Sequence, residues 1–306
     1  MLDSEARTNK LQARMDVIPD TTPNLLPSSQ VEGFRKDGFL VVRSFYDVEL
    51  TLHPIQRAIH GLIGLIIERH DLSIRQAPFD PAHFDSGYQE LIAVDRRYGG
   101  EVYDAVKQIP AFMRLVTDPR HETLLCQLRE TDLAGLASVS YGMRIDNPFE
   151  ERFRAPWHQE YTGQLRSLDG IGFWIPLQPV DRSMGAVELC AGSHTKGLFS
   201  VRQGDLKSPD KSGAYAQVLA KEDEIVSQYQ QVAPETRPGD LLLLDFLVVH
   251  RSGVNSTGRA RWSMQTRYFN FRDPTGMRIG WCGSYAAGKD VRQIHPEIFD
   301  AEDSRA

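Results

Sequence analysis

Apolar side chains recur at helical spacing through most of the first 130 residues of the chain. The longest such pattern runs from about residue 48 to residue 69, where apolar positions three and four residues apart would form one face of a helix. These positions are Leu52, Ile55, Ile59, Leu62, Ile63, Ile66 and Ile67. Shorter helical patterns cover residues 89–97, 101–108 and 121–130. The first part of the chain is therefore predicted to be mainly helical.

A short helix is also expected just after residue 27. Ser28 and Ser29 are residue types typical of helix N-caps, and we expect Glu32 to reach back in a capping box. Gly38 would end this helix, because glycine readily adopts the left-handed conformation found at helix C-termini. The apolar run Phe39-Leu40-Val41-Val42 then predicts a strand.

The pattern changes after residue 130, where strand-like stretches alternate with turns rich in glycine, proline and aspartate. The predicted strands are residues 136–145, 170–179, 186–189, 241–249 and 261–271, and Pro238-Gly239-Asp240 is a typical turn between two of them. Helices followed by antiparallel strands predict an α+β fold whose second half is a sandwich or a barrel.

Nothing in the sequence resembles a linker between the helical and the β halves. We therefore expect one domain over residues 28–306, with helical support in 28–130, a β-core in 131–272 and a C-terminal extension in 273–306. Residues 1–27 are polar, contain three prolines and show no periodicity, so they predict a flexible arm.

The composition of the chain argues against several classes of function. Hydrophobic residues make up 41% and charged residues 25% of the 306 positions, which is typical of a globular protein with a large core. The net charge of −6 and the lack of a long Lys/Arg cluster argue against a nucleic-acid partner. Three scattered cysteines favour a reducing compartment. The apolar residues 61–67 are too few to span a membrane, and the N-terminus shows no signal-like apolar region, so we expect a cytoplasmic protein without membrane insertion.

The residue types that could bind a metal are concentrated at two places. His158 and Glu160 are two positions apart, so in an extended segment their side chains project to the same side. His250 follows the apolar run 241–249 and would lie where a core strand ends, at the mouth of a barrel. Two histidines and one carboxylate form the facial triad that holds Fe(II), and the absence of a cysteine disfavours structural zinc. A His-x-Glu pair alone also occurs by chance, so the prediction depends on the remaining motifs.

These motifs together resemble the phytanoyl-CoA dioxygenase family of Fe(II)/2-oxoglutarate oxygenases, over roughly residues 29–272. The matching segments, in order, are residues 33–42, Trp157-His158-Gln159-Glu160, Trp174-Ile175-Pro176-Leu177, residues 185–194, Pro238-Gly239-Asp240, His250-Arg251-Ser252 and Arg261. The resemblance implies a double-stranded β-helix, the jelly-roll or cupin-like fold, with iron at its open end. It also implies that His158, Glu160 and His250 ligate the iron.

The same resemblance implies a cosubstrate site. Arg261 would bind the distal carboxylate of 2-oxoglutarate, a role that the planar guanidinium suits, and Ser252 would add a hydroxyl contact. Trp174 matches an aromatic residue that lines the cosubstrate pocket. Arg259 is the competing candidate for the carboxylate contact, although the family spacing favours Arg261. The implied reaction consumes O2 and 2-oxoglutarate and releases succinate and CO2.

One residue departs from the usual family pattern. The family triad normally has Asp where this chain has Glu160, which moves the carboxylate by about 1.5 Å, the length of one carbon–carbon bond. Rotamer changes can absorb this difference, so iron binding remains the expectation. Related halogenases have a small residue at this position to admit chloride, and Glu160 therefore argues against halogenation.

Several polar residues are candidates for binding the prime substrate. Strand alternation would place Arg261, Gln265 and Arg267 on one face, so Arg267 could meet a polar or anionic substrate, or instead form an ion pair with a nearby acid. Tyr161 and Gln164, beside the metal motif, are weaker candidates. His194 is interpreted as a structural loop residue rather than a third histidine ligand.

The preferred interpretation is a dioxygenase that hydroxylates, desaturates or cyclises a small organic substrate. Two alternatives remain open at this point, a non-catalytic jelly-roll binding protein and a cupin-like metal hydrolase with the same three ligands. The cosubstrate residues distinguish them, because a hydrolase needs no 2-oxoglutarate site. The sequence leaves the oligomeric state open, a homodimer included.

Overall fold

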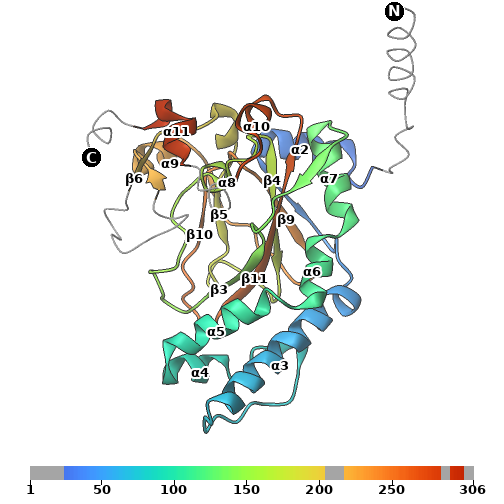
Figure 1. The fold of residues 1–306 in the computed structure, drawn as a ribbon, viewed down its shortest axis with the longest axis vertical. Helices are drawn as coiled ribbons and strands as arrows, with labels where there is room; N and C mark the ends of the chain where they lie inside the picture. Colours follow the sequence, from blue (N-terminus) through green and yellow to red (C-terminus); the bar gives the residue numbers. More distant parts are fainter. Residues whose placement is uncertain (1–23, 204–216, 284–289, 300–306) are drawn as a thin grey trace, which may run out of the picture.

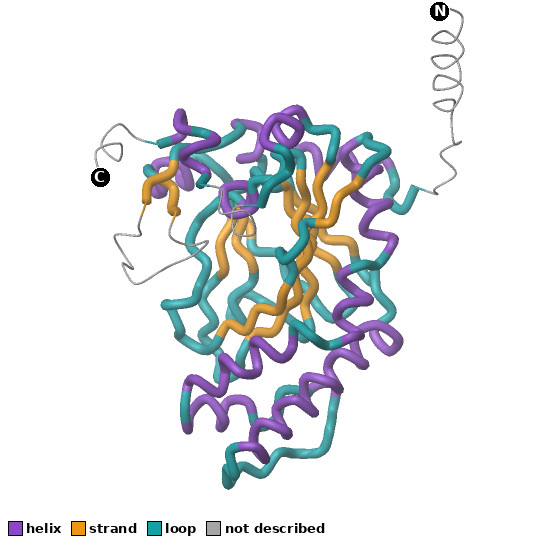
Figure 2. The backbone as a smooth tube through the Cα atoms, viewed as in Figure 1, coloured by secondary structure: helices purple, strands orange, loops and turns teal. Residues whose placement is uncertain are grey.

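The computed structural model describes residues 24–203, 217–283 and 290–299. Helices dominate up to residue 130 and pack along one side and one end of the β-sheets, which the rest of the chain forms together with one early strand, as Figures 1 and 2 show. The helices before the β-core are α2 (Ser28–Asp37), α3 (His53–Arg69), α4 (Tyr88–Val94), α5 (Arg96–Val106), α6 (Pro110–Val116) and α7 (Pro119–Arg129). Short helical turns lie at Val48–Leu52, which leads directly into α3, and at Pro81–His83. The prediction of a mainly helical first part is confirmed, and α6 is an additional helix.

The larger sheet has six strands and forms one wall of the β-core. Its strands are β1 (Phe39–Val42), β2 (Ala134–Leu136), β3 (Gly142–Asp146), β4 (Gly170–Pro176), β9 (Leu241–Asp245) and β11 (Arg261–Asn270). They follow the order β1-β9-β4-β11-β2, and β3 pairs with the other half of β11. All pairings within this sheet are antiparallel. The first strand of the described residues, β1, thus forms one edge of the sheet, beside a strand that follows it by about two hundred residues.

Side chains along the central strands point alternately to the two faces of the larger sheet, and the two faces have different neighbours. Leu241 and Leu243 of β9 face the helices, where the largest apolar cluster joins them to side chains of α3, α6 and α7. Leu242 and Leu244 face the opposite way and belong to a second cluster with Trp174 of β4. Since side chains alternate along a strand, the polar residues of β11 that alternate with its buried apolar ones point to this inner side. The inner side is where the second sheet packs.

The second sheet contains β10 (His250–Ser252), β5 (Val187–Cys190) and β8 (Gln231–Val232), in the order β10-β5-β8. A small ribbon of β6 (Val201–Gln203) and β7 (Gln217–Leu219) lies beside it. Short helices connect or follow the strands, at α8 (Glu160–Gln164), Ser193–Lys196, α9 (Glu222–Ser227), α10 (Pro274–Ile279), α11 (Val291–Ile294) and Pro296–Ile298. Two antiparallel sheets around a shared interior, with helices packed outside, confirm the predicted α+β jelly roll.

Two predicted strands differ from the structure. The stretch 136–145 is two strands, β2 and β3, separated by a turn that includes Ser140. The strand expected over 241–249 ends at Asp245, whose Oδ1 accepts a hydrogen bond from the backbone N–H of Leu247 at 2.7 Å and turns the chain. His250 therefore begins β10 in the second sheet rather than ending the apolar strand.

The start of α2 also differs from the prediction. Pro27 is its N-cap residue and no side chain caps the helix, so the expected capping box of Ser28 and Glu32 is absent from the described structure. The end is as predicted, because Gly38 has a φ of 79° and donates its backbone N–H to Phe34. Leu26, assigned to the flexible arm, is buried and exchanges two hydrogen bonds with Gln127. Residues 1–23 of that arm lie outside the described residues.

The segment Val48–Arg69 is long and apolar enough to cross a membrane by length and composition alone. Its side chains Ile55, Ile59 and Ile63 are fully buried within the protein, and the helix packs against α5 and α6. This one-sided burial is the pattern of a core helix in a globular domain.

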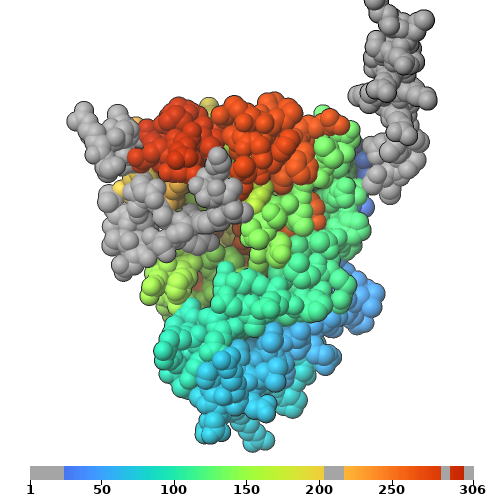
Figure 3. Space-filling view, in the orientation of Figure 1, coloured from blue at the N-terminus to red at the C-terminus, as the bar shows by residue number. Residues whose placement is uncertain are grey.

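The C-terminal extension covers one end of the molecule. In the space-filling view, the last segments of the chain (orange to red) lie at the opposite end from α3 (blue), as Figure 3 shows. The Tyr161 hydroxyl and the His295 Nε2 lie 2.8 Å apart, which ties the extension to the short helix α8. The domain limits predicted from sequence remain a prediction, since residues 284–289 and 300–306 are not described.

Candidate active site

Two histidines far apart in the sequence meet through their backbones. His158 and His250 form an isolated antiparallel bridge, in which each backbone N–H donates to the other residue's carbonyl at 3.0 Å. A directly hydrogen-bonded antiparallel pair holds its side chains on the same face. The two imidazole ring centres are consequently 4.3 Å apart. The backbone bridge between His158 and the first residue of β10 therefore sets the spacing of these two side chains.

Each imidazole is held so that one particular nitrogen faces the other candidate ligands. His158 Nδ1 lies 2.8 Å from the carbonyl of Pro156, and His250 Nδ1 lies 3.0 Å from the carbonyl of Val248. A carbonyl only accepts hydrogen bonds, so each Nδ1 carries a proton, and in the neutral tautomer that this fixes the lone pair is on Nε2. This arrangement is typical of histidines that bind a metal through Nε2.

Glu160 reaches the same place because of the residue before it. Gln159 has extended backbone angles, and its amide is buried in the opposite direction, where it donates to the carbonyls of Gly197 and Leu247 at 2.8 and 2.7 Å. With Gln159 anchored on one side, His158 and Glu160 both point to the other side. The spacing argument made from the sequence therefore describes the local geometry correctly.

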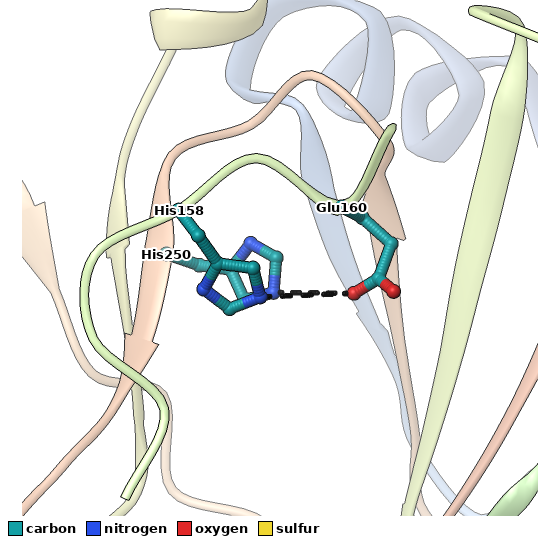
Figure 4. A group of neighbouring side chains, drawn as sticks. All are labelled: His158, Glu160 and His250. Atoms are coloured by element: carbon teal, nitrogen blue, oxygen red, sulfur yellow. Dashed lines mark ion pairs between the residues drawn. The ribbon is translucent and has the colours of Figure 1, made fainter. Parts of the chain in front are cut away.

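The three side chains converge on one point, as Figure 4 shows. Glu160 Oε2 lies 3.9 Å from His158 Nε2 and 3.8 Å from His250 Nε2, and one ligand atom from each residue falls within 4.8 Å of the others. Two imidazole nitrogens and one carboxylate oxygen at these distances could hold a single divalent ion. Burial first, and then the neighbouring His158, lowers the pKa of His250 to about 3, so its ring is neutral and available to a metal.

The second oxygen of Glu160 is occupied by two donors. Oε1 accepts a hydrogen bond from Arg267 Nε at 2.6 Å and another from Gln164 Nε2 at 2.9 Å. Burial alone would raise the pKa of Glu160, but the charge of Arg267 and the contacts with both histidines outweigh it and hold that pKa well below its usual value. Glu160 is therefore an ionised carboxylate with one oxygen bonded to protein donors and one facing the histidines.

Arg267 is held by the protein itself. Besides the bond to Glu160, Nη1 donates to the carbonyl of Ser140 at 2.8 Å and Nη2 donates to Gln265 Oε1 at 2.7 Å. This outcome matches the ion-pair alternative that the sequence left open. Binding of substrate by Arg267 stays a prediction, and each of its three guanidinium nitrogens already donates to a protein acceptor in this structure.

The predicted cosubstrate residues also come together. Arg261 is 1% exposed, and its Nη2 lies 3.1 Å from Ser252 Oγ, while its guanidinium carbon lies 5.8 Å from the centre of the Trp174 ring. Trp174 and Ser252 line a narrow pocket of about 40 Å³ that also contains all three candidate metal ligands. Arg259 lies elsewhere, in an ion pair of 2.6 Å with Asp85. The competing candidate is thus not at the site.

Two charged residues that the sequence interpretation did not single out belong to this site. Asp146 pairs with Arg261 across β3 and β11, and its carboxylate contacts Arg261 Nη2 at 2.7 Å and Arg144 Nη2 at 2.8 Å. Burial opposes ionisation of Asp146, but the two arginines outweigh it and lower its pKa below the usual value. Arg144 itself lines the pocket. The alternation of Arg144 and Asp146 in one strand was a signal that could have revealed them.

A wider pocket opens from the candidate metal ligands towards the surface. It has a volume of about 210 Å³ and is lined by polar groups, among them Tyr141, Thr162, Gln164 and Gln265, and it reaches the half-exposed Tyr103. His158, Glu160, Arg144, Gln265 and Arg267 line both pockets. The narrow pocket and the wider one therefore meet at His158 and Glu160, while His250 lines the narrow pocket alone.

One predicted substrate residue does not face either pocket. Tyr161 is fully buried, and its hydroxyl contacts His295 in the C-terminal extension. Because Glu160 begins α8, the next residue is rotated by about 100° around the helix and points away. His194 lies in the short helical turn Ser193–Lys196, with Nε2 3.0 Å from the carbonyl of Arg35, and is not among the three converging side chains.

Comparison with known proteins identifies relatives of this fold. The sequence model of the phytanoyl-CoA dioxygenase (PhyH) family matches residues 34–263. No curated protein matches the chain. The α-ketoglutarate-dependent carbocyclase SnoK from nogalamycin biosynthesis is 17% identical with a TM-score of 0.52, covering 80% of this chain and 85% of that chain.

The enzyme EctD from S. alaskensis is similar in the same way. Its structure with bound Fe is 17% identical with a TM-score of 0.52, covering 84% of this chain and 83% of that chain. Its structure with 2-oxoglutarate and 5-hydroxyectoine is 16% identical with a TM-score of 0.54, covering 83% and 80%. These likenesses show a shared fold. Because the family match extends over most of the β-core and includes the three candidate ligands, the chain belongs to the phytanoyl-CoA dioxygenase family and is an Fe(II)- and 2-oxoglutarate-dependent dioxygenase.

Proposed function

We propose that His158, Glu160 and His250 hold Fe(II), and that Arg261 and Ser252 bind the distal carboxylate of 2-oxoglutarate. The observation that carries the proposal is the convergence of two imidazole lone pairs and one carboxylate oxygen within 4.8 Å of one another. Nitrogen and oxygen ligands of this kind suit Fe(II) and leave positions open on the opposite face. The two backbone carbonyls bound to the Nδ1 atoms supply the outer hydrogen bonds that such ligands require.

The neighbouring groups fit a dicarboxylate cosubstrate. None of the described residues accepts a hydrogen bond from Arg261 Nε or Trp174 Nε1, although both atoms are buried. Buried donors without acceptors are costly, and a bound carboxylate and its solvent would satisfy them. Ser252 Oγ lies on the same side as the Arg261 guanidinium, at 3.1 Å. A guanidinium and a hydroxyl together form a typical carboxylate site.

We further propose that the substrate is small and polar and binds in the wider pocket. The pocket volume of about 210 Å³ fits a compact molecule, and its amide, hydroxyl and phenol groups can orient one through hydrogen bonds. When bound, iron supplies the centre at which O2 and 2-oxoglutarate are converted, so that a substrate C–H bond becomes C–OH while 2-oxoglutarate yields succinate and CO2. Desaturation or ring closure are the other outcomes that such a site allows.

This chain's own residues would do three things in that reaction. The bridge between the two histidines fixes the ligand geometry before any metal binds. Arg261 and Ser252 would orient the cosubstrate, since Ser252 lines the narrow pocket and lies 3.1 Å from Arg261 Nη2. Trp174, Val187 and Leu244, which belong to one apolar cluster, line that pocket and would limit the access of water to it. A water-excluded cavity strengthens each electrostatic contact within it.

Both alternatives from the sequence have less support. A metal hydrolase would use the same ligands but has no need of a buried arginine with an unsatisfied Nε beside a hydroxyl. A non-catalytic binding protein would tolerate the loss of a ligand, and all three are present with matched outer hydrogen bonds.

Anaerobic absorption spectroscopy tests the proposal. Purified protein mixed with Fe(II) and 2-oxoglutarate should develop a weak visible charge-transfer band. We expect the band to be lost in His158→Ala, where iron binding fails, and to require more 2-oxoglutarate in Arg261→Gln. If folded, iron-loaded wild-type protein gives no band, the proposed cosubstrate site is wrong.

A further inference from the structure

The two oxygens of Glu160 have different surroundings. Oε1 accepts hydrogen bonds from Arg267 at 2.6 Å and from Gln164 at 2.9 Å. Oε2 faces the Nε2 atoms of His158 and His250, at 3.9 and 3.8 Å. A free glutamate would exchange these oxygens by rotating its last torsion, which has a broad and roughly two-fold energy profile. The two donors remove that freedom.

Both donors are themselves fixed, and they come from different elements. Arg267 lies within β11, paired with Gly172 of β4, and its other two nitrogens donate to Ser140 and Gln265. Gln164 lies one helical turn after Glu160 in α8, and its Oε1 lies 3.3 Å from Arg166 Nη1. A strand and a helix therefore hold the same oxygen from two directions.

We propose that Arg267 and Gln164 are positioning residues that hold Glu160 Oε1 away from the metal, so that Glu160 ligates through Oε2 alone. The proposal rests on the proposed function, in which Glu160 is an iron ligand. It assigns Arg267 to the metal ligand rather than to the substrate.

The number of coordination positions on the metal explains why it matters whether Glu160 binds through one oxygen or through both. An octahedral ion with three protein ligands has about three positions left, of which a chelating cosubstrate takes two and O2 needs one. A glutamate that bound through both oxygens would take one of these positions. The hydrogen bonds from Arg267 and Gln164 compete with the metal for Oε1 and so keep that position open.

The number of metal-bound waters measures this directly. Mn(II) replaces Fe(II) as the probe, and water-proton relaxation counts the exchangeable waters on the ion. The main variant is Arg267→Lys, which keeps the positive charge but loses the planar fork that bonds Glu160, Ser140 and Gln265 at once. Gln164→Leu is the second variant, since it removes one donor without changing any charge.

The matched control is Arg129→Lys. Arg129 has the same chemistry, an ion pair of 2.8 Å with Asp245 and 14% side-chain exposure compared with 16% for Arg267, but it contacts none of the three ligands. We expect wild type and Arg129→Lys to keep about three waters on Mn(II). Arg267→Lys should keep about two, and its affinity for 2-oxoglutarate should fall by about ten-fold or more, because chelation then competes with Glu160 Oε1. Gln164→Leu should lower the number of waters on Mn(II) and the affinity for 2-oxoglutarate as well, but by less than Arg267→Lys does.

Two different failures can be told apart. If wild type binds no Mn(II), or if His158→Ala binds it equally well, the metal site itself is wrong. If wild type binds Mn(II) through these ligands and folded Arg267→Lys keeps the same number of waters and the same 2-oxoglutarate affinity, the positioning role alone is overturned. Thermal unfolding of each variant checks that the fold is intact. In a Glu160→Asp background, whose shorter side chain retreats from Arg267, Arg267→Lys should have little further effect on the water number.

Discussion

Replacing Asp146 by asparagine removes one charge from the cosubstrate site without changing its shape. Asp146 lies between Arg144 and Arg261, at 2.8 and 2.7 Å, and its pKa is held below the usual value, so it is negative at any working pH. Its carboxylate and the proposed 2-oxoglutarate carboxylate would share the Arg261 guanidinium. We predict that Asp146→Asn binds 2-oxoglutarate more tightly than wild type.

The magnitude follows from the geometry around Arg261. Two carboxylates bound to one guanidinium are roughly 5 Å apart, and like charges at that distance repel by about 3 kcal/mol at an effective dielectric constant of about 20. The full value corresponds to about a hundred-fold in affinity, and relaxation of the site reduces it. We expect 2-oxoglutarate to bind at least about ten-fold more tightly. The unliganded variant should lose about 3 kcal/mol of stability, because Arg261 is 1% exposed and loses its carboxylate partner.

Anaerobic calorimetry with Mn(II)-loaded protein measures this affinity, and thermal unfolding with and without 2-oxoglutarate measures the stabilisation. Asp85→Asn is the matched control, since it breaks the buried Arg259–Asp85 pair of 2.6 Å. That variant should lose stability but keep the wild-type affinity. Unchanged or weaker binding in folded Asp146→Asn would refute the charge argument. An effect of Asp85→Asn equal to that of Asp146→Asn would point to Arg259 as the carboxylate residue.

Three further predictions concern stability and cosubstrate binding. Burial lowers the pKa of His121 to about 4, against the opposing charge of Asp118, while an unfolded histidine titrates near about 6.5. As the pH falls, the unfolded chain therefore takes up this proton before the folded protein does. The free energy of unfolding should fall by about 2 kcal/mol between pH 7 and pH 4.5. Urea titrations of His121→Phe should show that this part of the pH dependence is lost. Tyr161→Phe removes the 2.8 Å contact with His295 and should cost about 1–2 kcal/mol in denaturant unfolding, with turnover unchanged within about two-fold. Ser252→Ala should weaken 2-oxoglutarate binding by about three- to ten-fold in titrations while leaving the Mn(II) affinity unchanged.

Local sequence patterns were sufficient to predict the framework of the site. The two-residue spacing of His158 and Glu160 predicted side chains on the same side, and the buried amide of Gln159 explains why that holds. Alternation predicted that Arg261 and Arg267 share the inner face of one strand, as the structure has them. These predictions use periods of two residues, which depend only on the backbone conformation.

The partners of these side chains could not be predicted in the same way. Alternation gives the face on which Arg267 lies, but its contact with Glu160 depends on how β11 packs against the segment before α8. The pairing of Arg261 with Asp146 depends on strand register, and the predicted strand 136–145 ended one residue too early to include it. Tyr161 was misassigned because a helix begins at Glu160 and rotates the next side chain away. Tertiary packing decides all three contacts.

The central claim is that one iron ion binds His158, Glu160 and His250, and a crystal structure of the Fe(II)-loaded protein tests it most directly. Anomalous scattering at the iron edge should give one strong peak at about 2.0–2.2 Å from Nε2 of each histidine and from Oε2 of Glu160, the usual range for such ligands. Oε1 of Glu160 should remain bonded to Arg267. A peak at another place, or iron bound without Glu160, would contradict the account.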